Sequence, residues 1–184
     1  MNTLVVYDSQ YGNTERLAQA IANVLRTFGL AQAVRIDAAH PVSLQDVDLL
    51  ILGSPTQGFR ATRAMQSLLG TISFQQLRGL TVACFDTRFR GFLWTRSAAS
   101  YMVRQLRMLG VEPIVLPESF FVKTMKKEGP LLAGEEARAA RWALAIHLRY
   151  ETRTAHLAAH EPEQGNTPVA DTAGTPEQVL SHPT

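Results

Sequence analysis

Short, mostly apolar stretches alternate with amphipathic stretches along the first 150 residues. The mostly apolar stretches predict buried strands at residues 3–7, 33–36, 49–53, 81–85 and 113–116. Apolar residues spaced three and four apart predict helices at residues 15–28, 62–69, 97–109 and 134–150. Strands that are apolar on both faces and alternate with helices are typical of a parallel sheet covered on both sides. The pattern therefore predicts an α/β fold with a three-layer, doubly wound, five-stranded parallel sheet.

Two segments break this alternation. Residues 117–132 form a long connection, in which residues 118–122 have the composition of a strand that extends or repeats the fifth one. From about residue 152 the chain turns to Ala, His, Glu, Pro, Gly and Thr without periodicity. Such a composition cannot bury enough apolar surface to offset the entropy cost of ordering. We expect one folded domain over residues 1–151 and a disordered C-terminal tail over residues 152–184.

The first predicted strand leads through a short polar loop into the first predicted helix. The loop carries the hydroxyl of Ser9 at one end and that of Thr14 at the other, with Gly12 between them. A helix N-terminus offers free backbone N–H groups and the positive end of the helix dipole, and so favours a phosphate. A simpler interpretation is that Ser9 and Asn13 only cap the helix. Ligands of doubly wound sheets bind at the carboxyl ends of strands, and this favours the phosphate interpretation.

Two further polar loops follow the third and fourth predicted strands. The third strand ends in Gly53-Ser54-Pro55-Thr56-Gln57-Gly58-Phe59-Arg60, where proline and glycine build a turn with outward-pointing backbone groups. The fourth ends in Asp86-Thr87-Arg88-Phe89-Arg90-Gly91-Phe92-Leu93-Trp94, which adds aromatic rings. With strand order 2-1-3-4-5, the ends of strands one, three and four open onto one crevice. That crevice suits a planar heterocycle with a phosphate tail, the shape of flavin mononucleotide (FMN).

The loop sequences carry a family resemblance over about residues 1–150. Ser9-Gln10-Tyr11-Gly12-Asn13-Thr14-Glu15 resembles the phosphate loop of the flavodoxin family, and Gly53-Ser54-Pro55-Thr56 with Gly58 resembles that family's second flavin loop. The resemblance implies a flavodoxin-like fold, non-covalently bound FMN and electron transfer through the flavin. It assigns the phosphate to Ser9, Gln10, Tyr11, Gly12, Asn13 and Thr14. It assigns one side of the isoalloxazine ring to Pro55, Thr56, Gln57, Gly58 and Phe59, and the other side to Asp86, Thr87, Arg88, Phe89 and Gly91.

Charge is the feature in which this chain departs from the family pattern, because flavodoxins are usually strongly acidic. Here the first 151 residues hold 17 of the 18 Lys and Arg residues, against 12 acidic residues. The third loop contains Arg88 and Arg90, and Arg96 follows it. A guanidinium near the pyrimidine edge of the flavin would stabilise the reduced anion, and a basic rim would attract an anionic partner or a nucleotide phosphate. The alternative is that these arginines form an ordinary solvated face.

Other functional classes have little support in the sequence. There is no dense basic stripe with interleaved aromatic residues, so we expect no nucleic-acid binding. No apolar run is long enough for a membrane span, and the start of the chain lacks the pattern of a signal peptide, so we expect a cytoplasmic protein. The single cysteine, Cys84, lies in a predicted buried strand without a neighbouring base, which indicates a core residue. No catalytic residue or metal site is predicted.

The leading hypothesis is a flavodoxin-like redox protein that mediates electron transfer through FMN. Its partners would be redox proteins or a small quinone-like acceptor. One alternative is an NAD(P)H-dependent FMN oxidoreductase of the quinone-reductase type, although the chain has no second glycine-rich nucleotide fingerprint. Another is a flavin-free, flavodoxin-like interaction module, in which Tyr11 or the third loop fills the crevice.

Overall fold

The computed structural model describes residues 1–36, 42–92, 96–124 and 129–159. Its centre is a five-stranded sheet in the order β2-β1-β3-β4-β5, with every neighbouring pair parallel. The strands are β1 (Asn2–Tyr7), β2 (Leu30–Arg35), β3 (Leu49–Pro55), β4 (Thr81–Phe89) and β5 (Glu118–Val122). The predicted fold class and strand order are confirmed.

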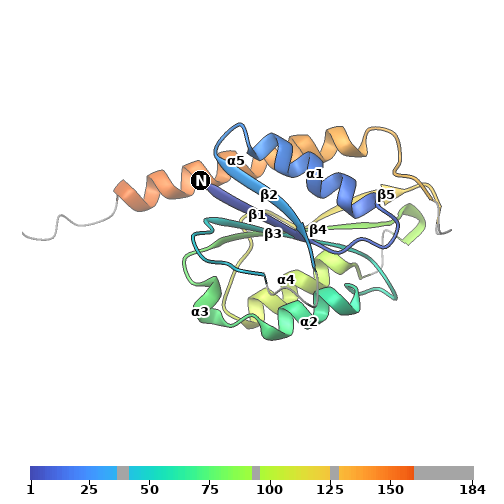
Figure 1. Cartoon of the computed structure of the whole chain (residues 1–184), viewed down its shortest axis with the longest axis horizontal. Coiled ribbons are helices and arrows are strands. Elements are labelled where there is room, and N and C mark those ends of the chain that lie inside the picture. The colour runs from blue at the N-terminus through green and yellow to red at the C-terminus, as the bar shows by residue number, and fades with distance from the viewer. Residues whose placement is uncertain (37–41, 93–95, 125–128, 160–184) are drawn as a thin grey trace, which may run out of the picture.

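Helices cover both faces of the sheet (Figure 1). One face carries α1 (Asn13–Leu25) and α5 (Glu135–Ala159), and the other carries α2 (Arg63–Thr71), α3 (Phe74–Leu77) and α4 (Ala98–Met108). A short 3-10 helix, η1 (Arg90–Phe92), follows β4 directly. Among the described residues, no helix combines the length and the apolar character needed to cross a bilayer.

The sheet separates two apolar cores. Along β3, Leu49 and Ile51 face the core beneath α1 and α5, whereas Leu50 and Leu52 face the core beneath α2 and α4. Successive side chains of a strand point to opposite faces, so a strand buried on both faces is apolar at every position. This is why the central strands could be read from the sequence as unbroken apolar runs.

The fifth strand differs from its prediction at residues 113–116. The sheet instead uses Glu118–Val122, which pairs with the second half of β4. Pro113 and Pro117 lack the N–H group that a strand ladder needs, and in that stretch Ile114 donates one backbone hydrogen bond, to Val82 (2.9 Å). The shift matters for the site because the segment after Val122 now reaches the carboxyl edge of the sheet.

The boundary of the predicted tail is also wrong. Helix α5 continues to Ala159, so residues 152–159 are helical rather than disordered. The first proline beyond Thr152 is Pro162, and the intervening alanine, leucine and arginine residues are good helix formers. The end of α5 projects past the sheet (Figure 1). Residues 160–184 of the predicted tail lie outside the described residues.

Candidate functional site: a crevice at the carboxyl edge of the sheet

A cavity of about 360 Å³ lies where β1, β3 and β4 end. This volume lies in the range of small-ligand sites, which is roughly 300–1,000 Å³. The structure brings the three predicted loops together around it. The predicted site residues on its wall are Ser9, Gln10, Tyr11, Asn13, Thr14, Pro55, Thr56, Gln57, Gly58, Phe59, Thr87, Arg88 and Phe89.

Three predicted site residues lie off this wall. Gly12 faces a more open neighbouring hollow between the loop and the start of α5. Gly91 belongs to η1, where an added Cβ would lie 2.5 Å from the ring of Phe89, so it gives that ring room to pack. Asp86 is fully buried beneath α4.

The buried carboxylate of Asp86 anchors a helix end. One of its oxygens accepts a hydrogen bond from the backbone N–H of Ala99, in the first turn of α4 (2.9 Å). Burial raises the pKa of Asp86, although hydrogen bonds from Ser97 and Ala99 act in the opposite direction. Its position indicates a structural function in holding α4 rather than a contact with a ligand in the cavity.

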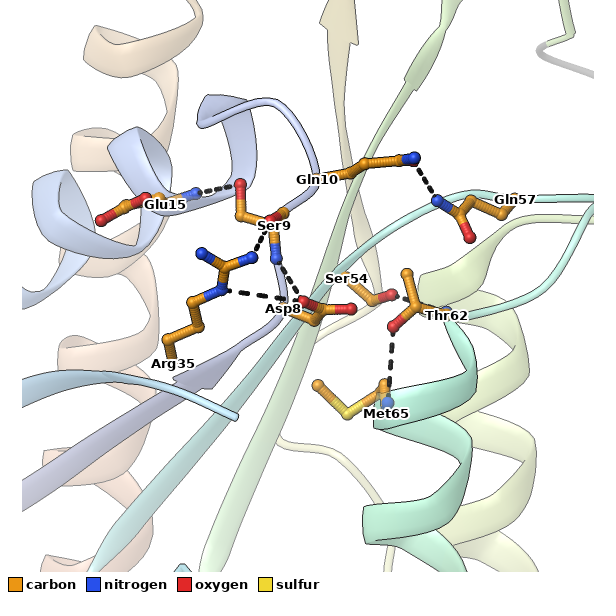
Figure 2. Close-up of polar contacts among 9 residues, drawn as sticks. All are labelled: Asp8, Ser9, Gln10, Glu15, Arg35, Ser54, Gln57, Thr62 and Met65. Carbon is orange, nitrogen blue, oxygen red and sulfur yellow. Dashed lines mark hydrogen bonds and ion pairs between the residues drawn. The ribbon is translucent and has the colours of Figure 1, made fainter. Parts of the chain in front are cut away.

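The loop between β1 and α1 is held by contacts to its own neighbours (Figure 2). The backbone N–H of Asp8 continues the sheet ladder to the carbonyl of Gly53 (3.0 Å). The Asp8 carboxylate accepts from the backbone N–H of Ser9 (2.8 Å), and Arg35 donates to the Ser9 carbonyl (2.6 Å). The loop is therefore positioned before any ligand binds.

The amide groups of this loop form an open row of donors. Helix α1 begins at Asn13, and its cap, Gly12, has φ 81° and no side-chain hydrogen bond. The Ser9 hydroxyl accepts from the backbone N–H of Glu15 (3.3 Å), so part of the capping interpretation is correct. The backbone N–H groups of residues 10–14, however, donate to no oxygen of any described residue. Five consecutive unpartnered amides at the positive end of a helix favour an anion.

Two buried hydroxyls lie at the same end of the cavity. Thr14 and Thr87, both nearly fully buried, share a hydrogen bond of 2.8 Å between their side-chain oxygens. One proton lies between the two oxygens, so the second hydroxyl proton is available to a ligand. Thr14 comes from α1 and Thr87 from β4, so this pair joins two of the three loops.

The loop after β3 ends in a tight turn. Gln57 and Arg60 exchange two backbone hydrogen bonds, of 2.9 and 3.0 Å. Gly58 and Phe59 between them have φ of 53° and 66°, the pattern of a type I′ turn. Across the mouth of the cavity, the side-chain amide of Gln57 donates to that of Gln10 (Figure 2).

The rest of this loop is tied to its surroundings. Thr56 donates its backbone N–H to the carbonyl of Thr87 (2.9 Å), and its hydroxyl accepts from the N–H of Ala98 at the start of α4 (2.8 Å). The hydroxyl of Ser54 accepts from the N–H of Thr62, whose own hydroxyl caps α2 (Figure 2). The second and third loops are thereby fixed relative to each other.

Sequence reasoning missed a fourth wall of the cavity. Val122, at the end of β5, lines it together with Thr124 and Gly129 from the segment that follows. The side chain of Asn13 donates to the carbonyl of Gly129 (2.7 Å), which joins this segment to the first loop. The signal available in the sequence was the strand-like composition of residues 118–122. Once that segment forms the fifth strand, its carboxyl end lies at the same edge of the parallel sheet as the ends of the other strands, and therefore at the crevice.

The fold and this crevice define a doubly wound α/β protein with a ligand site at the switch point of its sheet. The sequence model of the flavodoxin family matches residues 5–141. The chain therefore belongs to the flavodoxin family, and this membership implies a flavin-dependent redox function.

Individual relatives agree with this placement. The chain is 28% identical over 169 residues to a Nostoc sp. protein named "Putative diflavin flavoprotein A 6", covering 89% of this chain and 28% of the relative. Its fold is similar to that of oxidised flavodoxin 1 from Bacillus cereus (TM-score 0.66, 18% identity), covering 80% of this chain and 98% of the flavodoxin. Its fold is also similar to that of rubredoxin oxygen:oxidoreductase from Desulfovibrio gigas (TM-score 0.66, 18% identity), covering 84% of this chain and 37% of the oxidoreductase. The chain thus spans less than a third of the length of the curated relatives it matches.

Proposed function

We propose that the protein binds FMN non-covalently, about one molecule per chain, and that it transfers electrons through this flavin. The observation that carries the proposal is the row of unpartnered backbone amides at residues 10–14, set beside the buried hydroxyls of Thr14 and Thr87. A terminal phosphate matches these donors, whereas a neutral ligand would leave most of them without an acceptor.

The cavity has two ends that would hold different parts of the cofactor. The phosphate end is lined by residues 9–11, Asn13, Thr14 and Thr87, which would bind the phosphate through amides and hydroxyls. The ring end consists of residues 55–59, Arg88 and Phe89, which would enclose the isoalloxazine ring. Bound FMN supplies one- and two-electron redox chemistry. The residues of the ring end would hold the ring beside the exposed turn at residues 57–60 and would limit its contact with water.

Cofactor analysis of the purified protein tests this proposal. We expect a visible flavin spectrum, and we expect the flavin released by denaturation to chromatograph as FMN at about one equivalent. The apoprotein should regain the spectrum when FMN is added, and the bound flavin should be reduced and reoxidised reversibly under anaerobic conditions. A protein that takes up no FMN, or that selects FAD or riboflavin over FMN, would contradict the proposal.

Reduction kinetics separate the carrier from the oxidoreductase hypothesis. We expect the bound FMN to exchange electrons rapidly with one-electron reagents and to be reduced only slowly by NADH or NADPH. Rapid, saturable reduction by either nucleotide would instead identify an NAD(P)H-dependent oxidoreductase.

A further inference from the structure

Exposed basic residues lie at the edge of the sheet that also holds the ring end of the cavity. The basic residues come from loops that follow different strands, and parallel strands place all their carboxyl ends at one edge of the sheet. The exposed members, here called the basic rim, are Arg60, Arg63, Arg90, Arg96 and Lys123. Within the described part of the chain, none of these five side chains forms an ion pair.

The acidic residues near this edge do not offset the basic rim. Asp8 lies 4.0 Å from the guanidinium of Arg35, and Glu136 forms an ion pair with Arg16 (2.9 Å). Asp86 is fully buried, and burial raises its pKa. Glu15, in the first turn of α1, is half-buried and hydrogen-bonded to the phenol of Tyr7. Among the described residues at this edge, exposed positive charge therefore exceeds exposed negative charge.

Two exposed aromatic side chains line the same cavity. Tyr11 and Phe59 are each 48% exposed and come from the loops after β1 and β3. Phe59 also has φ 66°, a backbone conformation that bulky residues rarely adopt. The paired backbone hydrogen bonds of Gln57 and Arg60 hold it there. Backbone strain of this kind persists mainly at functional sites.

We infer that the basic rim, together with the exposed Tyr11 and Phe59 of the cavity wall, is the docking surface for an acidic protein that carries single electrons. Arginine and aromatic residues are the side chains enriched at the energetic centres of protein interfaces. A positive face attracts and orients a negative partner, which raises the association rate more than the final affinity. Docking here would bring the partner's redox centre next to the ring end.

The inference rests on the proposed function, since it requires flavin at the ring end. The transfer itself is simple: one electron leaves the reduced metal centre of the partner and enters the flavin, and no covalent bond forms or breaks. The partner is left in its oxidised form. Charge steering acts on the encounter that precedes this step, so it should depend strongly on ionic strength.

Stopped-flow kinetics with probes of different charge test the docking surface. The FMN-loaded protein is mixed with a reduced, acidic [2Fe–2S] ferredoxin, and the rate of flavin reduction is measured at low and high salt. We expect the second-order rate to fall at least about tenfold as salt rises. In the variant with R60E, R63E and R96E together, the low-salt rate should fall by a similar factor and its salt dependence should largely disappear.

Two controls isolate the effect of the rim. The variant with R78E and R153E makes the same kind of change at exposed arginines away from the crevice, and it should behave as the unaltered protein. Reoxidation of the reduced flavin by neutral benzoquinone should be equally fast in all three proteins. Loss of flavin, or of its reaction with benzoquinone, in the unaltered protein would overturn the proposed function itself.

Three outcomes would overturn the docking inference while leaving the proposed function intact. The first is a ferredoxin rate that is independent of salt. The second is an equal loss of rate in the rim variant and in the control variant. The third is a rim variant with an unchanged ferredoxin rate but a raised KM for NADPH, which would mean that the rim recognises a nucleotide phosphate.

Discussion

The two ends of the cavity differ in how their polar groups are used. At the phosphate end, Ser9 and Thr14 are nearly fully buried, and their hydroxyls form hydrogen bonds with the N–H of Glu15 and the hydroxyl of Thr87. At the ring end, the turn at residues 57–60 is exposed and is bordered by arginines without ion pairs in the described part of the chain. The first arrangement is preorganised for one small anion, and the second is open to solvent.

This difference suggests a division of tasks between the two ends. Preorganised donors contribute affinity because they need no reordering when the ligand arrives. Exposed charge contributes little to affinity, but it alters reduction potential and the rate of encounter with partners. We therefore expect changes at the phosphate end to affect cofactor retention and changes at the ring end to affect reactivity.

The largest expected effect is at the phosphate end. Replacing Ser9 by Ala and Thr14 by Val removes two hydroxyls from it. Each hydrogen bond to a charged group contributes about 1.5–3 kcal/mol, so FMN affinity should fall by roughly tenfold or more per substitution. Fluorescence titration of the apoprotein measures this loss.

Riboflavin lacks the phosphate and serves as the matched ligand for that variant. Its affinity should change much less than that of FMN. Thr14→Ser keeps a hydroxyl and should retain most of the FMN affinity, and Thr27→Val alters an exposed threonine beyond the end of α1 and should change nothing. Equal weakening of FMN and riboflavin would show that the phosphate does not bind at residues 9–14.

Asp86→Asn should change stability without changing either end of the cavity. The buried carboxylate has a raised pKa, so its ionisation destabilises the fold as pH rises above its ordinary value of 3.8. Asparagine can still accept from the N–H of Ala99 but does not ionise. The variant should therefore gain thermal stability relative to the unaltered protein as pH increases from 4 to 7, with unchanged FMN affinity. A clear loss of FMN binding would place Asp86 in the binding site after all.

Arg88→Gln tests the ring end. Arg88 lines the cavity and is only 7% exposed, whereas Arg90 is exposed and lies off the cavity wall. A nearby positive charge stabilises the reduced anionic flavin, so removing it should lower the potential of the second one-electron reduction by roughly tens of millivolts. Arg90→Gln should have a smaller effect that vanishes at high salt. Equal potentials in both variants and the unaltered protein would show that neither arginine tunes the flavin.

The smallest effect is expected from shortening the chain after residue 151. Residues 152–159 continue α5, but nearly all their side chains are exposed and none contributes to the two cores. The shortened protein should keep its FMN affinity and lose little thermal stability. A large drop in either quantity would show that the C-terminal residues pack on the domain.

The elements that could be predicted are those whose residue pattern along the chain matches their burial in the folded protein. Strands β1, β3 and β4 are buried on both faces, so their apolar runs marked them directly. The edge strand β5 is only partly buried, and the apolar residues beside it at 113–116 gave a stronger but misleading signal. The short helices α3 and η1 are too brief to show a period.

The site was predictable to the extent that it consists of loops at strand ends. Most residues of the first two loops that the resemblance assigned to the flavin line the cavity, because the carboxyl ends of parallel strands meet at one edge of the sheet. That they bind flavin stays a prediction. The inward or outward direction of a single side chain was not predictable: Asp86 and Thr87 are neighbours on β4, yet only Thr87 reaches the cavity. The segment after β5 was missed because its position depends on which residues form that strand.

Amide NMR spectra of the apoprotein, titrated in parallel with FMN and with riboflavin, test most directly whether the backbone amides of residues 10–14 hold the phosphate. We expect FMN to shift the N–H resonances of these five residues strongly, because each amide gains a charged acceptor. Riboflavin should shift resonances of residues 55–59 and leave those of residues 10–14 nearly unchanged. Equal shifts of residues 10–14 with both ligands, or no shift with FMN, would contradict the account.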